Sequence, residues 1–193
     1  MMKRIFALLV TLGALSLYAG TYSLDMAHTQ VGFSVKHMMV SKVKGKFDFY
    51  EAEIEFDDKT MQFKKLNATI DADSVNTDNE RRDTHLRSAD FFDVAKHPKI
   101  TFVMTGYKGD KEGGKMTGDL TIRGITKPVT LDVEMGGLIT DFQGKRRLGF
   151  TMEGKVNRHD FGLEWNRMLE SGGFVVGDMV KIEIDVEAIE HSK

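Results

Sequence analysis

The stretch that decides the fold is GDLTIRGITKPVTLDV, residues 118–133. Apolar residues alternate with polar ones on both sides of Gly124, so each half of the stretch has one apolar and one polar face. Pro128 has no N–H group and fits the first residue of a strand. The stretch therefore predicts a β-hairpin whose apolar face packs against more sheet, because an isolated hairpin is only marginally stable in water.

The same alternation recurs along the rest of the chain. Apolar residues share one parity within each of several segments, namely residues 31–35, 43–56, 66–72, 100–104, 148–156 and 180–186. Residues 43–56 fit either two strands or one long bent strand. Because closing an antiparallel sheet removes its exposed edges, this pattern predicts an all-β fold, a single antiparallel barrel of about eight strands.

Two segments interrupt the alternation. In residues 77–92, Thr77 and Glu80 have the spacing of a capping box, and charged residues follow, which predicts a short helix on the surface or across an opening. His97 and Pro98 end this interruption. Residues 157–173 form the second interruption, around Phe161 and Trp165. These two side chains either pack in the core, which we favour, or plug or line an end of the barrel. The fold prediction therefore includes one or two short helices.

The N-terminus has the pattern of a secretory signal peptide. Lys3 and Arg4 precede an apolar run over residues 5–17, and Ala19 is a small residue suited to cleavage. The run is too short to span a hydrocarbon core, which takes about 20 residues. We therefore expect residues 1–19 to be a signal peptide and residues 20–193 to form one exported domain.

Composition excludes several classes of function. The chain has no cysteine, so disulfides, thiol nucleophiles and thiolate metal sites are absent, and its formal net charge of −2 argues against a nucleic-acid partner. The six histidines include no closely spaced pair of metal ligands. No Gly-x-Ser-x-Gly elbow or glycine-rich phosphate loop is present. We expect no catalytic residue, no metal and no cofactor.

The inward-facing side chains of an eight-stranded barrel can either fill the interior or leave room for one small ligand. The residues alone leave both alternatives open. If the barrel holds an apolar ligand, we expect these side chains to line it: Phe33, Val35, Phe47, Phe49, Ile70, Leu86, Phe91, Phe92, Phe102, Met104, Leu120, Ile122, Leu131, Val133, Phe150, Met152 and Trp165.

Several motifs, taken in order, resemble the YceI-like family of exported, polyisoprenoid-binding-type proteins. They are residues 22–25 with His28 and Thr29, and residues 33–37, 43–47, 82–86, 90–92, 97–98, 118–129, 158–162 and 177–180. The resemblance covers essentially the whole chain after residue 19. It implies an extended, lipocalin-like barrel in the periplasm with a long amphiphile such as an isoprenoid or fatty amide in its cavity. It also implies a homodimer and no established enzymatic activity.

Arg82 and His85 are the candidate ligands for a polar head group. They lie three residues apart, on one face of the predicted helix, and a guanidinium group suits phosphate whereas hydrogen bonding suits an amide. The alternative is structural: Asp83 pairs with Arg87, and the arginines tie the helix to the barrel. The resemblance does not choose between these roles.

The leading functional hypothesis is periplasmic binding, transport or sequestration of a long amphiphilic lipid (an isoprenoid, an isoprenoid quinone, or a fatty acid or amide), with transient membrane contact for exchange. One alternative is an enzyme acting on a quinone or prenyl lipid, with His85 as acid or base. Another is a stress-related structural or interaction protein whose barrel is filled.

Overall fold

The computed structural model describes residues 19–170 and 172–191. The signal peptide predicted over residues 1–19 lies, except for Ala19, outside the described residues. Within them, no helix is long and apolar enough to cross a membrane.

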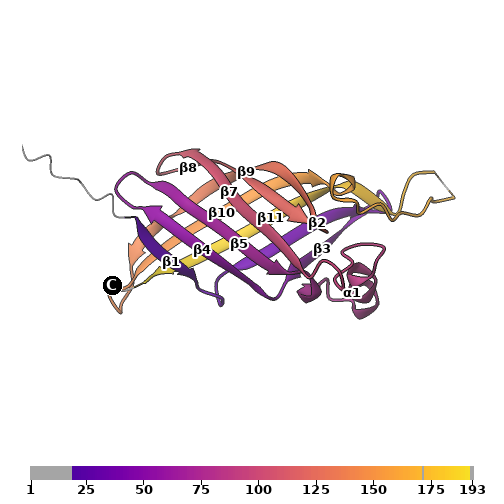
Figure 1. Ribbon diagram of the computed structural model, residues 1–193, viewed down its shortest axis with the longest axis horizontal. Helices are drawn as coiled ribbons and strands as arrows, with labels where there is room; N and C mark the ends of the chain where they lie inside the picture. The colour runs from indigo at the N-terminus through magenta and orange to yellow at the C-terminus, as the bar shows by residue number, and fades with distance from the viewer. Residues whose placement is uncertain (1–18, 171, 192–193) are drawn as a thin grey trace, which may run out of the picture.

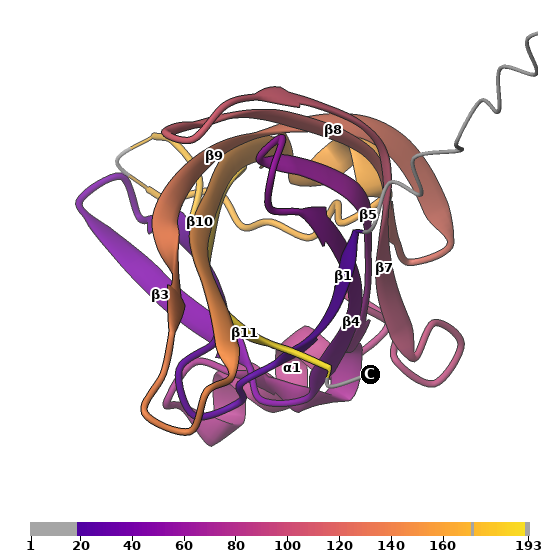
Figure 2. The ribbon, with the colours of Figure 1, turned by 90° about the vertical axis from the view of Figure 1, so that its left-hand side faces the viewer.

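Eight strands close into an antiparallel ring (Figures 1 and 2). Around the ring the order is β1, β4, β5, β7, β8, β9, β10 and β11, and β1 pairs back with β11. The bounds are β1 (Gly20–Leu24), β4 (Tyr50–Asp57), β5 (Gln62–Asp71), β7 (Lys99–Gly109), β8 (Gly113–Ile122), β9 (Ile125–Thr140), β10 (Arg146–Asn157) and β11 (Val176–Glu190). The predicted all-β, eight-stranded antiparallel barrel is confirmed, and the hairpin around Gly124 is formed by β8 and β9.

Three further strands extend one end of the ring. They are β2 (Gln30–His37), which pairs with β11, β3 (Ser41–Phe47), which pairs with β2, and β6 (Val75–Asn76), which pairs with β3. β1 and β2 thus share one edge of β11 and act as one long strand broken near Thr29, and β3 and β4 act likewise with a break at Asp48 and Phe49. The Tyr50 hydroxyl donates a hydrogen bond to the Thr29 carbonyl at 2.5 Å and ties the two breaks together.

The break between β3 and β4 corrects one expectation. Phe49 is 69% exposed and does not face the interior. Phe47 points inward at the end of β3, whereas Ile54 and Phe56 point inward from β4, so the inward parity changes from odd to even at the two residues between the strands. Phe49 lies in that change of phase, where its backbone N–H donates to the Ser74 hydroxyl at 3.1 Å.

The interruption predicted after residue 77 contains the helix α1 (Glu80–Arg87), preceded by the 3-10 turn η1 (Ala72–Ser74). A second 3-10 turn, η2 (Arg158–Phe161), begins the other interruption. The predicted capping box is wrong: Asn79 caps α1, and its side chain accepts from the Arg82 N–H at 3.0 Å. Thr77 lies two residues too early to cap, and its hydroxyl bonds side chains of the first turn instead. α1 lies at the end of the barrel away from the C-terminus (Figure 1).

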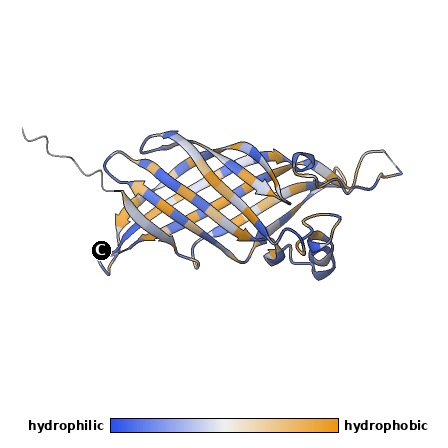
Figure 3. Cartoon of the chain, in the orientation of Figure 1, coloured by the Kyte–Doolittle hydropathy of each residue, from blue (hydrophilic) through white to orange (hydrophobic). Residues whose placement is uncertain are grey.

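The half of the barrel away from α1 is filled by aromatic side chains. Phe63 packs edge-on against Phe56, Tyr107 and Phe150, with ring centroids 4.9, 5.0 and 4.9 Å apart. Leu148 is fully buried beside them in the core. Figure 3 shows the corresponding alternation of hydrophobic and hydrophilic residues along the strands. The aromatic cluster, defined here as Phe56, Phe63, Tyr107 and Phe150, therefore closes the interior at that end.

Candidate functional site

The other half of the barrel encloses an apolar cavity of about 200 Å³. A single water needs only about 10–15 Å³ of such space, so this half of the interior is not filled. The cavity is lined almost wholly by aliphatic and aromatic side chains from the strands, from α1 and from the segment after it. Apolar surface of this kind gives no hydrogen bonds to water, so the cavity favours an apolar occupant.

Most of the side chains predicted to line the interior do surround this cavity. They are Phe33, Val35, Phe47, Ile70, Leu86, Phe91, Phe92, Phe102, Leu120, Ile122, Leu131, Phe150 and Met152. Met104 and Val133 face the interior as predicted and pack into the core, but they are not among the side chains that surround the cavity. The alternation predicts which side chains face inward, but it carries no information on their position along the barrel axis. At the positions of these two residues, other side chains fill the interior. Contact of any of these residues with a ligand stays a prediction.

Two inward glycines give the lining aromatics their room. A Cβ atom on Gly118 would lie 2.3 Å from the Phe102 ring, and one on Gly45 would lie 2.4 Å from the Phe33 ring. Both distances are shorter than non-bonded carbon atoms tolerate. A side chain at either position would therefore push a phenylalanine of the lining out of place.

β11 supplies lining residues that the predicted set left out. Val180, Ile182, Ile184 and Val186 all face the cavity. Their alternation with Lys181, Glu183 and Asp185 was the signal that could have included them. Because β11 pairs with β10 on one side and with both β1 and β2 on the other, its inward face spans the whole length of the cavity.

A second, more polar cavity of about 450 Å³ lies between α1 and the barrel end. It shares lining residues with the apolar cavity, Phe33, Leu86 and Phe91 among them, so the two lie next to each other. We call it the mouth. Its polar side chains are Lys36, His37, Asn79, Arg81, Arg82 and His85, and Trp165 lies there too rather than in the apolar interior. The site as a whole has an apolar interior and a polar, mainly basic entrance, which suits an amphiphile.

Arg82 reaches this mouth, but its guanidinium group is already engaged. Nε donates to the Thr77 hydroxyl and Nη2 to the Thr77 carbonyl, both at 2.7 Å. The buried Asp83 carboxylate accepts from the Thr77 N–H at 3.0 Å and from the Thr77 hydroxyl. The expected pairing of Asp83 with Arg87 is absent from the described residues: Arg87 bonds the carbonyls of Asp73 and Val75. These contacts tie α1 to the strand before it.

His85 is held by one acid and two aromatic rings. Its Nε2 lies 2.9 Å from the Asp90 carboxylate. The ring meets Phe91 and Trp165 edge to face, with centroids 5.1 and 4.8 Å apart. The sequence offered no sign of the partner Asp90, because the turn after α1 that brings it back cannot be derived from the local pattern.

Arg158 is the polar residue at the cavity wall that sequence reasoning missed as a site residue. It is 4% exposed, and burial lowers the pKa of its guanidinium group. Nε donates to the Gly177 carbonyl at 3.1 Å, and Nη1 donates to the carbonyls of Trp165 (3.0 Å) and Leu163. Arg158 thus fixes the segment after η2, which brings Phe161 and Leu163 to the cavity.

The neighbouring His159 bridges two acids on the outer side of the same segment. Its Nδ1 lies 2.7 Å from Glu164, and its Nε2 lies 2.9 Å from Asp178. The Asp178 hydrogen bond, and secondly that of Glu164, raise the pKa of His159. Protonated His159 therefore joins η2 to the start of β11.

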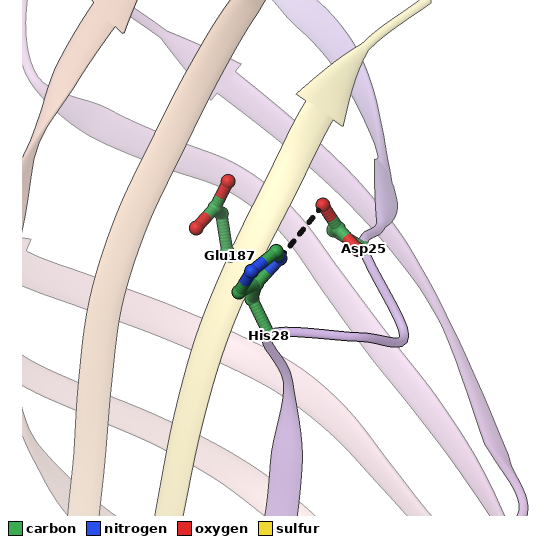
Figure 4. Close-up of side chains that lie close together, drawn as sticks. All are labelled: Asp25, His28 and Glu187. Atoms are coloured by element: carbon green, nitrogen blue, oxygen red, sulfur yellow. Dashed lines mark hydrogen bonds and ion pairs between the residues drawn. The ribbon is translucent and has the colours of Figure 1, made fainter.

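One group of side chains has the composition of a metal site. The ligand atoms of Asp25, His28 and Glu187 lie within 4.8 Å of one another, and Figure 4 shows His28 bonded to Asp25 beside Glu187 on β11. However, Arg147 donates to Asp25 at 2.8 Å, to Glu187 at 2.5 Å and to Asp141 at 2.8 Å. A guanidinium cation already pairs with these carboxylates, so the group is an ion-pair network.

The sequence matches known proteins over most of its length. A profile described as "YceI-like domain" matches residues 22–188. A UPF0312 protein of Staphylococcus aureus strain MSSA476 is 41% identical over 167 residues, which cover 86% of this chain and 95% of the relative.

Solved structures agree with this result. The crystal structure of a Campylobacter jejuni YCEI protein is 44% identical, covers 89% of this chain and 98% of its own, and has a TM-score of 0.70. Burkholderia cenocepacia BcnA (22% identity, 85% and 98% coverage, TM-score 0.73) and a polyisoprenoid binding domain from Saccharophagus degradans (17%, 90% and 100%, 0.61) share the fold. The chain therefore belongs to the YceI-like domain family.

Proposed function

We propose that this protein binds one long amphiphilic lipid in its barrel and carries or sequesters it, without catalysing a reaction. The observation that carries the proposal is the apolar cavity next to a mouth that bears Arg81, Arg82 and His85. An apolar chain would occupy the cavity, and its polar head would lie at the mouth. The candidates are an isoprenoid, an isoprenoid quinone, or a fatty acid or amide.

The energetics support binding of a long chain. Each buried CH₂ group contributes about 0.8 kcal/mol, so a chain of about 20 carbons gives roughly 16 kcal/mol before costs. Association costs are about 4–15 kcal/mol. Chain burial alone can therefore outweigh the cost of binding, and the head group needs to supply orientation more than affinity. The Saccharophagus degradans domain is described as polyisoprenoid binding, which favours an isoprenoid chain among the candidates.

The proposal includes where the protein works and with what. The pattern of residues 1–19 supports export to the periplasm, the resemblance to exported relatives supports a homodimer, and a lipid cargo requires transient contact with a membrane. N-terminal sequencing of the protein from cell fractions tests export. Sedimentation of the purified protein tests the dimer.

The decisive experiment identifies the cargo. Protein purified from its native host is extracted with organic solvent, and the extract is analysed by mass spectrometry alongside an Ala68→Phe variant. Ala68 lines the cavity, and a benzyl group there occupies space without adding charge. We expect one lipid class at near-stoichiometric amounts in the parent and much less in the variant. Repeated preparations with an empty cavity, or equal lipid in the variant, contradict the proposal.

One observation favours a second candidate, an enzyme acting on a quinone or prenyl lipid. The hydrogen bond between His85 and Asp90 is the arrangement in which a carboxylate orients an imidazole for proton transfer. The test is turnover of the identified lipid by the parent and by His85→Ala. Loss of turnover in the variant supports the enzyme, and no turnover by the parent removes it.

A further inference from the structure

Two neighbouring loops at the mouth expose apolar side chains. The turn between β2 and β3 exposes Met39 and Val40 by 68% and 87%, and Met38 beside them is also exposed. The loop before β11 exposes Met168 by 73% and Phe174 by 50%. We call these five side chains the tip surface. Monomeric soluble proteins rarely group so much exposed apolar surface without a binding role.

The two loops lie side by side and form one surface. The Met38 N–H donates to the Val175 carbonyl at 2.8 Å, and the Val175 N–H donates to the Arg167 carbonyl at 3.0 Å. Met168 and Phe174 pair across the second loop. Both loops project from the barrel end that carries α1 (Figure 1). Their apolar side chains can therefore enter one plane together.

The tip surface is bordered by cations. Lys36, Lys42 and Lys44 flank the first loop, and residues 36–44 contain no acidic residue. Arg167 begins the second loop, whose described residues include one acid, Glu170. The opposite end of the barrel also exposes Ile139 and Phe142, and basic residues follow at positions 145–147. There, however, Arg146 is paired with Asp58, and Arg147 is paired with three carboxylates. The tip surface thus combines exposed apolar groups with a basic border, which complements an anionic lipid headgroup layer.

The first loop has residues that its backbone does not favour. Met38 and Met39 have φ angles of +49° and +64°. Asn and Gly adopt this left-handed conformation at a lower energetic cost than methionine. Two methionines at these positions oppose folding stability, which is typical of residues retained for a binding role.

The tip surface also continues into the mouth of the cavity. Lys36 and His37 at the end of β2, and Val175 in the loop before β11, line the mouth and adjoin the tip surface. A flat partner seated on the tip surface would therefore cover or adjoin the mouth.

We propose that the tip surface docks on an anionic phospholipid bilayer, with Met38, Met39, Val40, Met168 and Phe174 entering the interface and Lys36, Lys42 and Arg167 contacting the headgroups. Docking places the mouth against the membrane, where a lipid can pass without crossing water. This proposal assigns the membrane contact of the proposed function to specific residues. It rests on the proposed function only for the identity of the lipid that passes between the membrane and the cavity.

The test is co-sedimentation with vesicles of phosphatidylcholine and phosphatidylglycerol in a three-to-one ratio, and with vesicles of phosphatidylcholine alone. The main variant is the double substitution Met38→Asn with Met39→Gly, which removes two apolar groups and suits the turn. Phe142→Ala at the opposite end is the matched control. Every sample has the same N-terminus, checked by intact mass, because a retained apolar run at residues 5–17 would itself bind vesicles.

We expect the parent to bind the anionic vesicles, the double variant to bind at least about tenfold more weakly, and Lys42→Gln to bind roughly fivefold more weakly. The melting temperature of the double variant should be unchanged or raised, so unfolding cannot explain its loss. Equal binding of parent and double variant, or a loss confined to Phe142→Ala, overturns the proposal. A change of oligomeric state in the double variant without vesicles also overturns it, since the surface would then pack on a second copy.

The cavity lipid is measured in the same preparations. Vesicle binding by protein with an empty cavity supports docking and contradicts the lipid-carrier function. A cavity filled with lipid, in protein that does not bind vesicles, supports the lipid-carrier function and contradicts docking.

Discussion

The carboxylate of Asp83 is buried and accepts hydrogen bonds from both the backbone N–H and the hydroxyl of Thr77, six residues earlier. This contact closes the segment between β6 and α1 into a loop. It fixes α1 over the mouth, because Arg82, next to Asp83, also bonds Thr77.

Replacing Asp83 with Ala should destabilise the protein by about 1–3 kcal/mol, because the N–H and hydroxyl of Thr77 lose a charged acceptor in a buried site. Glu80→Gln is the control. Its carboxylate is 88% exposed, so the expected change is within about 0.5 kcal/mol. Urea unfolding of both variants checks this. Equal stability of Asp83→Ala and the parent would show that the contact contributes nothing.

Arg82→Ala separates a head-group ligand from a strut for α1. If Arg82 binds a head group, lipid retention should fall more than folding stability, since water can replace the part-buried hydrogen bonds of Arg82 with Thr77. If the bonds to Thr77 are its main role, the melting temperature falls and the folded fraction keeps its lipid. Both quantities are measured on one preparation, and the second result removes Arg82 from the binding residues.

Phe102→Asp should unfold the protein or empty its cavity, because an unpaired carboxylate at this buried position of the lining is costly. Phe49→Asp makes the same chemical change at an exposed side chain and should leave the melting temperature and the lipid content as they are. The pair tests the change of inward parity between β3 and β4. Equal effects of the two substitutions would contradict it.

The hydrogen bonds of His159 predict a pH dependence of stability. Its pKa is raised above the usual 6.5, chiefly by Asp178. The stabilising effect is therefore complete below about pH 6.5 and is lost as the pH rises through the higher pKa of the folded state. The melting temperature of the parent should exceed that of His159→Gln most at about pH 6, and the difference should shrink towards about pH 8.5. A constant difference would show that His159 contributes no charge-dependent stability.

Arg147 predicts the opposite dependence. Its hydrogen bonds are the largest cause that lowers the pKa of Asp25 and of Asp141. Their contribution is present above the unfolded-state pKa of about 4 and is lost as the pH falls through the depressed values. Arg147→Gln should therefore lower the melting temperature at neutral pH, and the deficit should decrease below about pH 4. Adding Asp25→Asn to the Arg147→Gln variant should recover part of the loss.

The barrel was predictable because the sequence pattern that specifies each strand is local. The alternation around Gly124 and along β11 depends only on neighbouring residues, and so does the interruption that contains α1. Even the failure at Phe49 has a local cause, since the two-residue break there reverses the inward parity.

The geometry of the mouth was not predictable in the same way. The pairing of Thr77 with Asp83 replaces the expected capping box, and the contact of His85 with Trp165 joins residues 80 positions apart in sequence. Arg158 gave no periodic signal, because its role depends on three carbonyl groups from later segments of the chain. The contacts of His85 with Trp165 and of Arg158 with Gly177 arise only once the sheet has closed and has brought these segments together.

The aromatic cluster of Phe56, Phe63, Tyr107 and Phe150 makes the cavity a blind-ended tube. A lipid bound as proposed would enter tail first and leave head first, so its direction would be set before any polar contact forms. The closed end of the tube also limits the length of the chain that fits. A tail shorter than the tube would leave empty space, and a longer one would keep its head outside the mouth. If the barrel holds a lipid as proposed, side chains far from the entrance thereby select the length of the ligand.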